Sequence, residues 1–149
     1  MSESIEVYFR IPYPSLSGNN QYEKSGKGMR LRQEVIEYRD AVRAVLHGLG
    51  VAGLKLTGPI WVETHARPPR RGRFDQCNLE KVTWDALTKA DVWVDDSNLV
   101  IPCSIFRWYP PESPGSVSMW LRTYEGDEDE EEEMQAAAGA AAAEAAAVG

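Results

Sequence analysis

The sequence predicts a small α+β domain, in which two helices pack on one face of a small mixed sheet, followed by a low-complexity tail. Two segments with helical periodicity are separated along the chain by short strand-like segments. The 149 residues suffice for one ordinary domain plus a tail, and five Trp, six Tyr and three Phe can anchor its core. We therefore expect a domain over residues 1–124 and a tail over residues 125–149.

The first half of the domain is expected to hold one strand, one long loop and one helix. Residues 5–11 alternate apolar and polar side chains, and two prolines follow them, which predicts a strand that ends there. Residues 15–28 are rich in Ser, Gly and Asn, which is typical of a loop. From residue 32 to residue 49 apolar residues recur at helical spacing before a pair of glycines, which predicts an amphipathic helix.

The second half is expected to hold three strands and one helix. A strand at residues 60–66 precedes a Pro/Gly/Arg loop, and residues 78–89 have the apolar face of a helix. The last two strands are expected at residues 98–108 and 116–124, joined by a hairpin loop at residues 110–115. The helices should cover one face of the resulting sheet.

Charge is distributed unevenly along the chain. The net charge of the whole chain is −7, but nine of its 23 acidic residues lie in residues 125–149, which contain no Lys or Arg. The other 14 acids stand against all 16 bases, so residues 1–124 carry a net +2. Like charges repel along the acidic run, which predicts a disordered tail, and the asymmetry favours a nucleic-acid partner for the domain.

Several function classes are disfavoured. No run approaches the roughly 18 apolar residues needed to span a bilayer, so we expect no membrane partner. The first residues lack the pattern of a signal peptide. Two cysteines, Cys77 and Cys103, are too few for a disulfide scaffold, and we expect a reduced, cytoplasmic chain.

The segment at residues 70–99 is where chemistry is predicted. Carboxylates that converge repel one another, and a hard divalent cation such as Mg²⁺ relieves that repulsion. Arginines bind phosphate groups, so the combination favours metal-assisted phosphodiester hydrolysis, although an ordinary solvated charged face is the alternative. The acids and the neighbouring arginines are Asp75, Glu80, Asp85, Asp91, Asp95, Asp96, Arg67, Arg70, Arg71 and Arg73.

Three blocks in this segment stand at fixed spacing: DQCNLEK from Asp75, DALTKA from Asp85 and WVDDS from Trp93. Nearer the N-terminus, residues 11–14 read IPYP and residues 19–22 read NNQY. Together these blocks resemble the signature of RusA-type Holliday junction resolvases over residues 5–124.

The resemblance implies a RusA-like fold and a small homodimeric endonuclease, often encoded by a phage or prophage. Such an enzyme cuts four-way DNA junctions during recombination and repair, in the cytoplasm of a bacterial or phage-infected cell, with Mg²⁺ or with Mn²⁺ as a substitute. By the resemblance, Asp75 and Asp96 are catalytic metal-binding carboxylates, and Asp95 is a neighbouring metal-binding acid. Lys81 lies near the scissile phosphate as a catalytic lysine, where it stabilises developing negative charge.

Contacts with DNA are expected from an arginine-rich loop and from the N-terminal loop. Phe74 has two interpretations, because an aromatic ring at this position can wedge between unstacked bases or pack within the domain. The residues expected to bind DNA are Arg67, Arg70, Arg71, Arg73, Phe74, Asn19 and Asn20.

Cys77 departs from the family pattern, which has an Asp at this position. A thiol is soft and Mg²⁺ prefers oxygen, so this ligand is lost. Three interpretations follow: a junction-binding protein impaired in cleavage, an enzyme in which Asp75, Asp95 and Asp96 suffice, or a softer metal bound by a Cys77 thiolate. A separate hypothesis gives the acidic tail the role of a DNA mimic, which occupies the basic groove of its own domain or of another protein.

Overall fold

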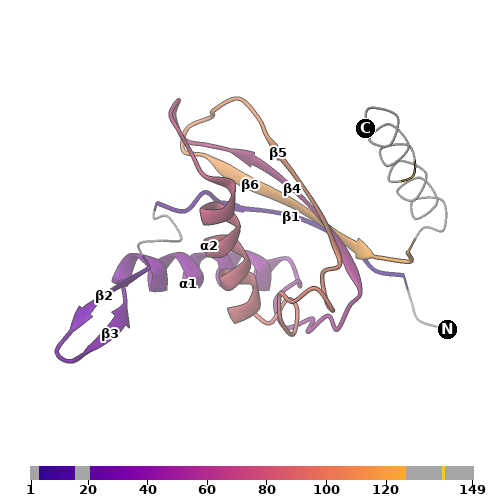
Figure 1. The fold of residues 1–149 in the computed structure, drawn as a ribbon, viewed down its shortest axis with the longest axis horizontal. Coiled ribbons are helices and arrows are strands. Elements are labelled where there is room, and N and C mark those ends of the chain that lie inside the picture. Colours follow the sequence, from indigo (N-terminus) through magenta and orange to yellow (C-terminus); the bar gives the residue numbers. More distant parts are fainter. Residues whose placement is uncertain (1–3, 16–20, 127–138, 140–149) are drawn as a thin grey trace, which may run out of the picture.

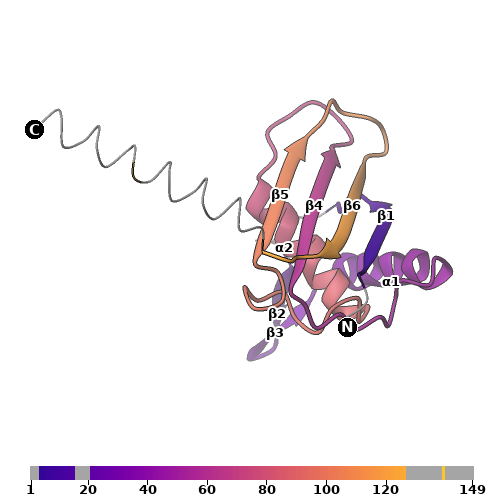
Figure 2. The same ribbon diagram turned by 90° about the vertical axis from the view of Figure 1, so that its right-hand side faces the viewer.

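The computed structural model describes residues 4–15, 21–126 and 139 of the chain. In these residues a four-stranded mixed sheet carries two helices on one face, which confirms the predicted α+β class (Figures 1 and 2). Apart from residues 125, 126 and 139, the predicted tail lies outside the described residues. The elements are β1 (Glu6–Pro12), β2 (Tyr22–Ser25), β3 (Gly28–Leu31), α1 (Gln33–Gly48), β4 (Ile60–Arg67), α2 (Gln76–Lys89), β5 (Cys103–Trp108) and β6 (Ser116–Thr123).

The strands of the sheet are ordered β1-β6-β4-β5. β6 is antiparallel to both β1 and β4, whereas β5 is parallel to β4. The predicted hairpin between the last two strands is therefore wrong, because β4 lies between them. The physical reason is α2, whose apolar face must pack on the sheet and which supplies the crossover that parallel neighbours require. β4, α2 and β5 thus form a β-α-β unit.

Two further segments differ from expectation. Residues 22–28, predicted as part of a loop, belong to the β2–β3 hairpin, which extends to Leu31 and whose turn contains Gly26 at φ +58°. This hairpin projects from the body beside the start of α1 (Figure 1). The strand expected from residue 98 begins only at Cys103, because the backbone N–H groups of Val100 and Ile101 both donate to the Ser97 carbonyl and form a turn.

The core lies between the sheet and the helices. Alternate residues of β4 are buried, which places one face of this strand against α1 and α2. The two helices bury the apolar faces predicted from their periodicity. The largest fully buried side chain is Trp93, which follows α2.

Tyr38 joins α1 to the end of β1. Its hydroxyl donates a hydrogen bond to the Pro12 carbonyl at 2.7 Å, next to the chain segment that leads into the candidate site. Burial, reinforced by the nearby Tyr13 phenol, raises the pKa of Tyr38 well above its usual value.

We expect Tyr38→Phe to lower the free energy of unfolding at pH 7 by about 1 kcal/mol, because the Pro12 carbonyl loses its donor. Because the folded pKa is raised, wild-type stability is fully present below the pKa of an unfolded tyrosine, about 10, and falls as the pH rises further. The variant should lose less stability than wild type between pH 9 and pH 11. Urea unfolding followed by circular dichroism measures both effects, and identical pH dependence of the two proteins would contradict the assignment.

Candidate active site

Asp75 begins the site at the N-terminus of α2. Its Oδ1 accepts a hydrogen bond from the Asn78 backbone N–H at 3.0 Å, so this carboxylate caps the helix. The side chain is exposed and lies at the positive end of the helix dipole. Asp75 is therefore a fixed, accessible carboxylate.

One face of α2 carries the next polar residues. Cys77, Lys81 and Asp85 follow at four-residue spacing, so they lie along one side of the helix. Cys77 is a free, exposed thiol. In the part of the chain that the structure describes, Lys81 has no ion-pair partner, although a pair with Asp85 is the ordinary expectation for this spacing. The Lys81 ammonium is thus available to a ligand.

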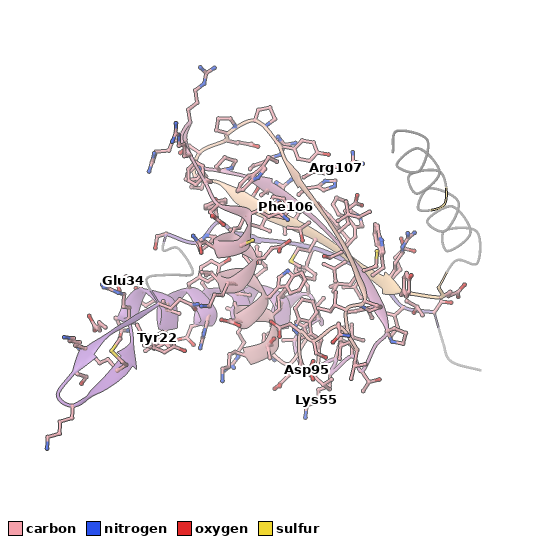
Figure 3. All side chains as sticks on the ribbon, in the orientation of Figure 1. Tyr22, Glu34, Lys55, Asp95, Phe106 and Arg107 are labelled. Atoms are coloured by element: carbon pink, nitrogen blue, oxygen red, sulfur yellow. The ribbon has the colours of Figure 1, made fainter. Side chains whose placement is uncertain are left out.

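Asp95 and Asp96 lie beyond the other end of α2. Hydrogen bonds from the Ser97 hydroxyl and backbone N–H hold the pKa of Asp95 below its usual value, and the backbone bond is 2.7 Å long. Figure 3 places Asp95 with Lys55 at one end of the molecule, away from Phe106. Both aspartates are exposed.

The expected carboxylate cluster does not form within one chain. The 14 residues of α2 rise about 20 Å, and they separate Asp75 from Asp95 and Asp96. Across residues 4–15, 21–126 and 139, no three His, Cys, Asp or Glu side chains group closely enough to hold a metal ion. Within the described part of one chain, Asp75 therefore stands apart from Asp95 and Asp96 and is not joined with them in one group of donors.

The arginine-rich loop before α2 is strongly cationic at its surface. Arg70, Arg71 and Arg73 are exposed, and none of them has an ion-pair partner among the described side chains. Arg67 differs, because it lies 3.9 Å from the Glu112 carboxylate and its guanidinium stacks over the Tyr109 ring. Three of the four predicted arginines are thus free to meet phosphates.

Phe74 lines two hollows, and Asp75 lines the smaller of them. One has a volume of about 290 Å³ and is lined by Tyr13, Asp75 and Asn78, among others. The other, of about 650 Å³, lies between the arginine loop and the end of β5. Phe74 lines both and is half-buried, so its ring packs within the domain and also faces open space.

Tyr13 is uncharged in the smaller hollow at neutral pH. Burial raises the pKa of Tyr13 to about 12, so its phenol keeps its proton. Its ring meets the Phe74 ring edge-to-face, with 5.8 Å between the ring centroids. The smaller hollow is therefore lined by two packed aromatic rings as well as by the Asp75 carboxylate.

Three aromatic residues of these hollows were not predicted from the sequence. They are Tyr13, Trp108 and Tyr109. Trp108 is the last residue of β5, and Tyr109 follows it directly before a proline pair. This position points to the hollows only once β5 is known to lie beside β4. Asn19 and Asn20, predicted to bind DNA, lie outside the described residues. No helix in the described part of the chain is long and apolar enough to cross a membrane.

Comparison with known proteins places these residues in a family. The chain matches the family described as Endodeoxyribonuclease RusA over residues 12–117. The crossover junction endodeoxyribonuclease of Enterobacteria phage 82 is 33% identical over 94 residues, which cover 62% of this chain and 76% of that protein.

Two bacterial relatives, both named crossover junction endodeoxyribonuclease RusA, have the same level of identity to this chain. The Shigella sonnei protein is 33% identical over 91 residues, 60% of this chain and 73% of that protein. The protein of Escherichia coli O139:H28 is 33% identical over 119 residues, 79% of this chain and 94% of that protein. With its fold, its capped Asp75 and its cationic loop, the chain belongs to the RusA endodeoxyribonuclease family.

Proposed function

We propose that this chain is a structure-specific endonuclease that resolves four-way DNA junctions in recombination and repair, by metal-dependent hydrolysis of phosphodiester bonds. The observation that carries the proposal is the accessible Asp75 carboxylate at the start of α2, preceded by three arginines that have no ion-pair partner among the described side chains. The relatives' names, crossover junction endodeoxyribonuclease, support the same substrate. A phage or prophage origin and a cytoplasmic location accompany the proposal, given the phage 82 relative.

The side chains on α2 and in the preceding loop have distinct roles in this proposal. Arg70, Arg71 and Arg73 hold the phosphates of the DNA backbone. Lys81 places its unpaired ammonium near the scissile phosphate and stabilises negative charge as it develops. Asp75 is held in position by its hydrogen bond from Asn78.

The proposed cofactor is Mg²⁺, with Mn²⁺ as a substitute. When bound, such a cation activates water and polarises the phosphate. Because one chain does not bring its acids together, we propose that two chains share each metal site. One would supply Asp75, and the other would supply Asp95 and Asp96.

A homodimer would explain how the separated acids can meet and how one junction is cut twice. A twofold axis sets the start of α2 in one chain against the end of α2 in the other and repeats that arrangement on the opposite side. Two equivalent sites also match a four-way junction, which is resolved by two symmetric cuts. The position of Asp75 at one end of α2 and of Asp95 and Asp96 beyond its other end supports this assembly.

Cys77→Asp tests the chemistry of the site. We expect wild-type protein to make paired nicks in a labelled four-way junction with Mg²⁺ or Mn²⁺. Cys77→Asp should raise the Mg²⁺-dependent rate at least about tenfold, because it replaces a soft thiol with a hard oxygen ligand. Gel analysis of the nicked strands gives the rate, and a mobility-shift assay without metal gives the affinity for the junction.

Cys77→Ser is the matched control, because it removes the thiol without adding a carboxylate. It should cut like wild type if oxygen ligands suffice, and it should lose cleavage if a Cys77 thiolate binds the metal. Junction binding without nicks in wild type, with cleavage gained in Cys77→Asp, would establish the alternative function of an impaired junction-binding protein. A wild-type chain that neither prefers nor cuts junctions would refute the proposal.

A further inference from the structure

The larger hollow beside Phe74 is built from two segments that are distant in sequence. The loop before α2 and the segment after β5 lie side by side at the top of both views (Figures 1 and 2). The Glu112 backbone N–H donates to the Pro68 carbonyl at 2.9 Å and joins these segments. The resulting hollow of about 650 Å³, here called the Phe74–Trp108 pocket, is lined by these two residues, Arg70, Arg71, Arg73 and Tyr109, among others.

Aromatic rings form one side of the Phe74–Trp108 pocket. The centroids of the Phe74 and Trp108 rings are 6.3 Å apart, and their planes are tilted by 39°. Phe106 supports the Trp108 ring from the side at 4.9 Å, yet 40% of Trp108 remains exposed. A supported but exposed indole offers a flat surface for a planar ring.

The rim of the pocket is cationic. Arg70, Arg71 and Arg73 line it without ion-pair partners among the described residues, and the Arg70 guanidinium lies 5.6 Å from the centroid of the Phe74 ring. The nearby Glu112 carboxylate pairs with Arg67. Flat aromatic surfaces inside a positive rim suit an uncharged planar ring that carries phosphates on either side, which is the chemistry of a nucleotide within a DNA strand.

We propose that the Phe74–Trp108 pocket receives one nucleobase displaced from its stack at the point of strand exchange. The inference rests on the proposed junction substrate and extends it to a defined subsite. Bases at the exchange point are less constrained than bases within a duplex arm, so displacing one costs less there. Because Phe74 lines the Asp75 hollow as well, a base in the pocket places its neighbouring phosphate beside Asp75.

The test uses photochemical cross-linking to the full-length chain without metal ions. 5-Iodouracil replaces thymine either at the exchange point of a four-way junction or within one arm, and cross-linked peptides are identified by mass spectrometry. We expect cross-links to Trp108 or Phe74 from the exchange-point position and not from the arm position. Cross-links that map only to other residues, or equally from both positions, would overturn the proposal.

Trp108→Leu should weaken junction binding about tenfold, because it removes the stacking surface and keeps an apolar side chain. Binding to linear duplex and the salt dependence of junction binding should stay at wild-type values, because both depend on the arginines. Trp108→Phe should recover most of the affinity. Tyr124→Leu, in a hollow at the other end of β4, is the matched control and should bind like wild type. Equal junction affinity of Trp108→Leu and wild type would contradict the proposal.

Failure of this proposal differs from failure of the proposed function. A wild-type chain that cuts junctions but shows no cross-link at the pocket retains the function and loses the inference. If the chain shows no preference for junctions, a single-stranded oligonucleotide with 5-iodouracil tests the pocket directly. Cross-linking of that strand to Phe74 or Trp108 would support the base-binding site, and its absence would refute it.

Discussion

Mixing the Asp75→Asn and Asp96→Asn variants is expected to restore the DNA cleavage that each variant has lost alone. Each substitution removes a proposed metal-binding carboxylate, so each should lower the cleavage rate by about a hundredfold or more. If Asp75 and Asp96 meet only across a dimer, a mixed dimer has one site with both substitutions and one site with neither. The second site is fully wild type.

Random exchange of subunits sets the size of the recovery. Half of the dimers are then mixed and each has one intact site, so about a quarter of the wild-type sites return. The mixture should make single nicks in place of paired nicks. Fluorescence energy transfer between labelled chains confirms that subunits have exchanged. Asp40→Asn, an exposed substitution on α1 outside the proposed site, is the control for the effect of replacing an acid and should cut like wild type. An exchanged mixture without activity would show that the two acids do not act across chains.

Trp93→Ala is expected to lower the free energy of unfolding by about 3–5 kcal/mol. The Trp93 side chain is fully buried and packs edge-to-face on Trp84, with 5.8 Å between the ring centroids. Its Nε1–H donates to the Thr88 hydroxyl at 2.7 Å, so the substitution removes both packing and a hydrogen bond. Urea unfolding followed by fluorescence or circular dichroism measures the loss.

Two companion variants separate these contributions. Trp93→Phe keeps most of the packing and loses the Nε1–H, so it should cost about 1–2 kcal/mol. Trp108→Ala removes an indole that is 40% exposed and should cost less than half as much as Trp93→Ala, since the loss scales with buried area. Equal destabilisation at the two tryptophans would contradict the assignment of Trp93 to the core. Trp93 also anchors the segment that leads to Asp95 and Asp96, so loss of stability and loss of cleavage should coincide.

The helices and the core could be predicted from the sequence because their signals are local. The apolar periodicity of α1 and α2 reports which face each helix buries. The β2–β3 hairpin gave no such signal, because its apolar side chains stay in solvent: Tyr22 is 51% exposed and Met29 is 64% exposed. The position of β5 was also hidden, because pairing with β4 is decided by the α2 crossover and not by neighbouring residues.

In the candidate site, too, local features could be predicted from the sequence and contacts between distant segments could not. The helix cap at Asp75 could be predicted from residues next to it. The distance to Asp95 and Asp96 depends on the length of α2 and on the path of the chain after it, which residue spacing does not report. The Phe74–Trp108 pocket depends on the pairing of Ala66 with Trp108, a contact between distant segments. These acids retain their catalytic and metal-binding roles as predictions.

The order of the sheet has a consequence for how the domain is made. β1 pairs only with β6 in the described sheet. Glu6 is the register partner of Arg122, so almost the whole sequence of the domain lies between two paired residues. β1 is therefore synthesised long before its partner β6, and β6 also supplies the second neighbour of β4. Such long-range pairing slows folding, because a large loop must close before its contacts stabilise the chain. The described sheet can thus be completed only after β6 has been synthesised, and a chain truncated before β6 would leave both β1 and β4 with open edges.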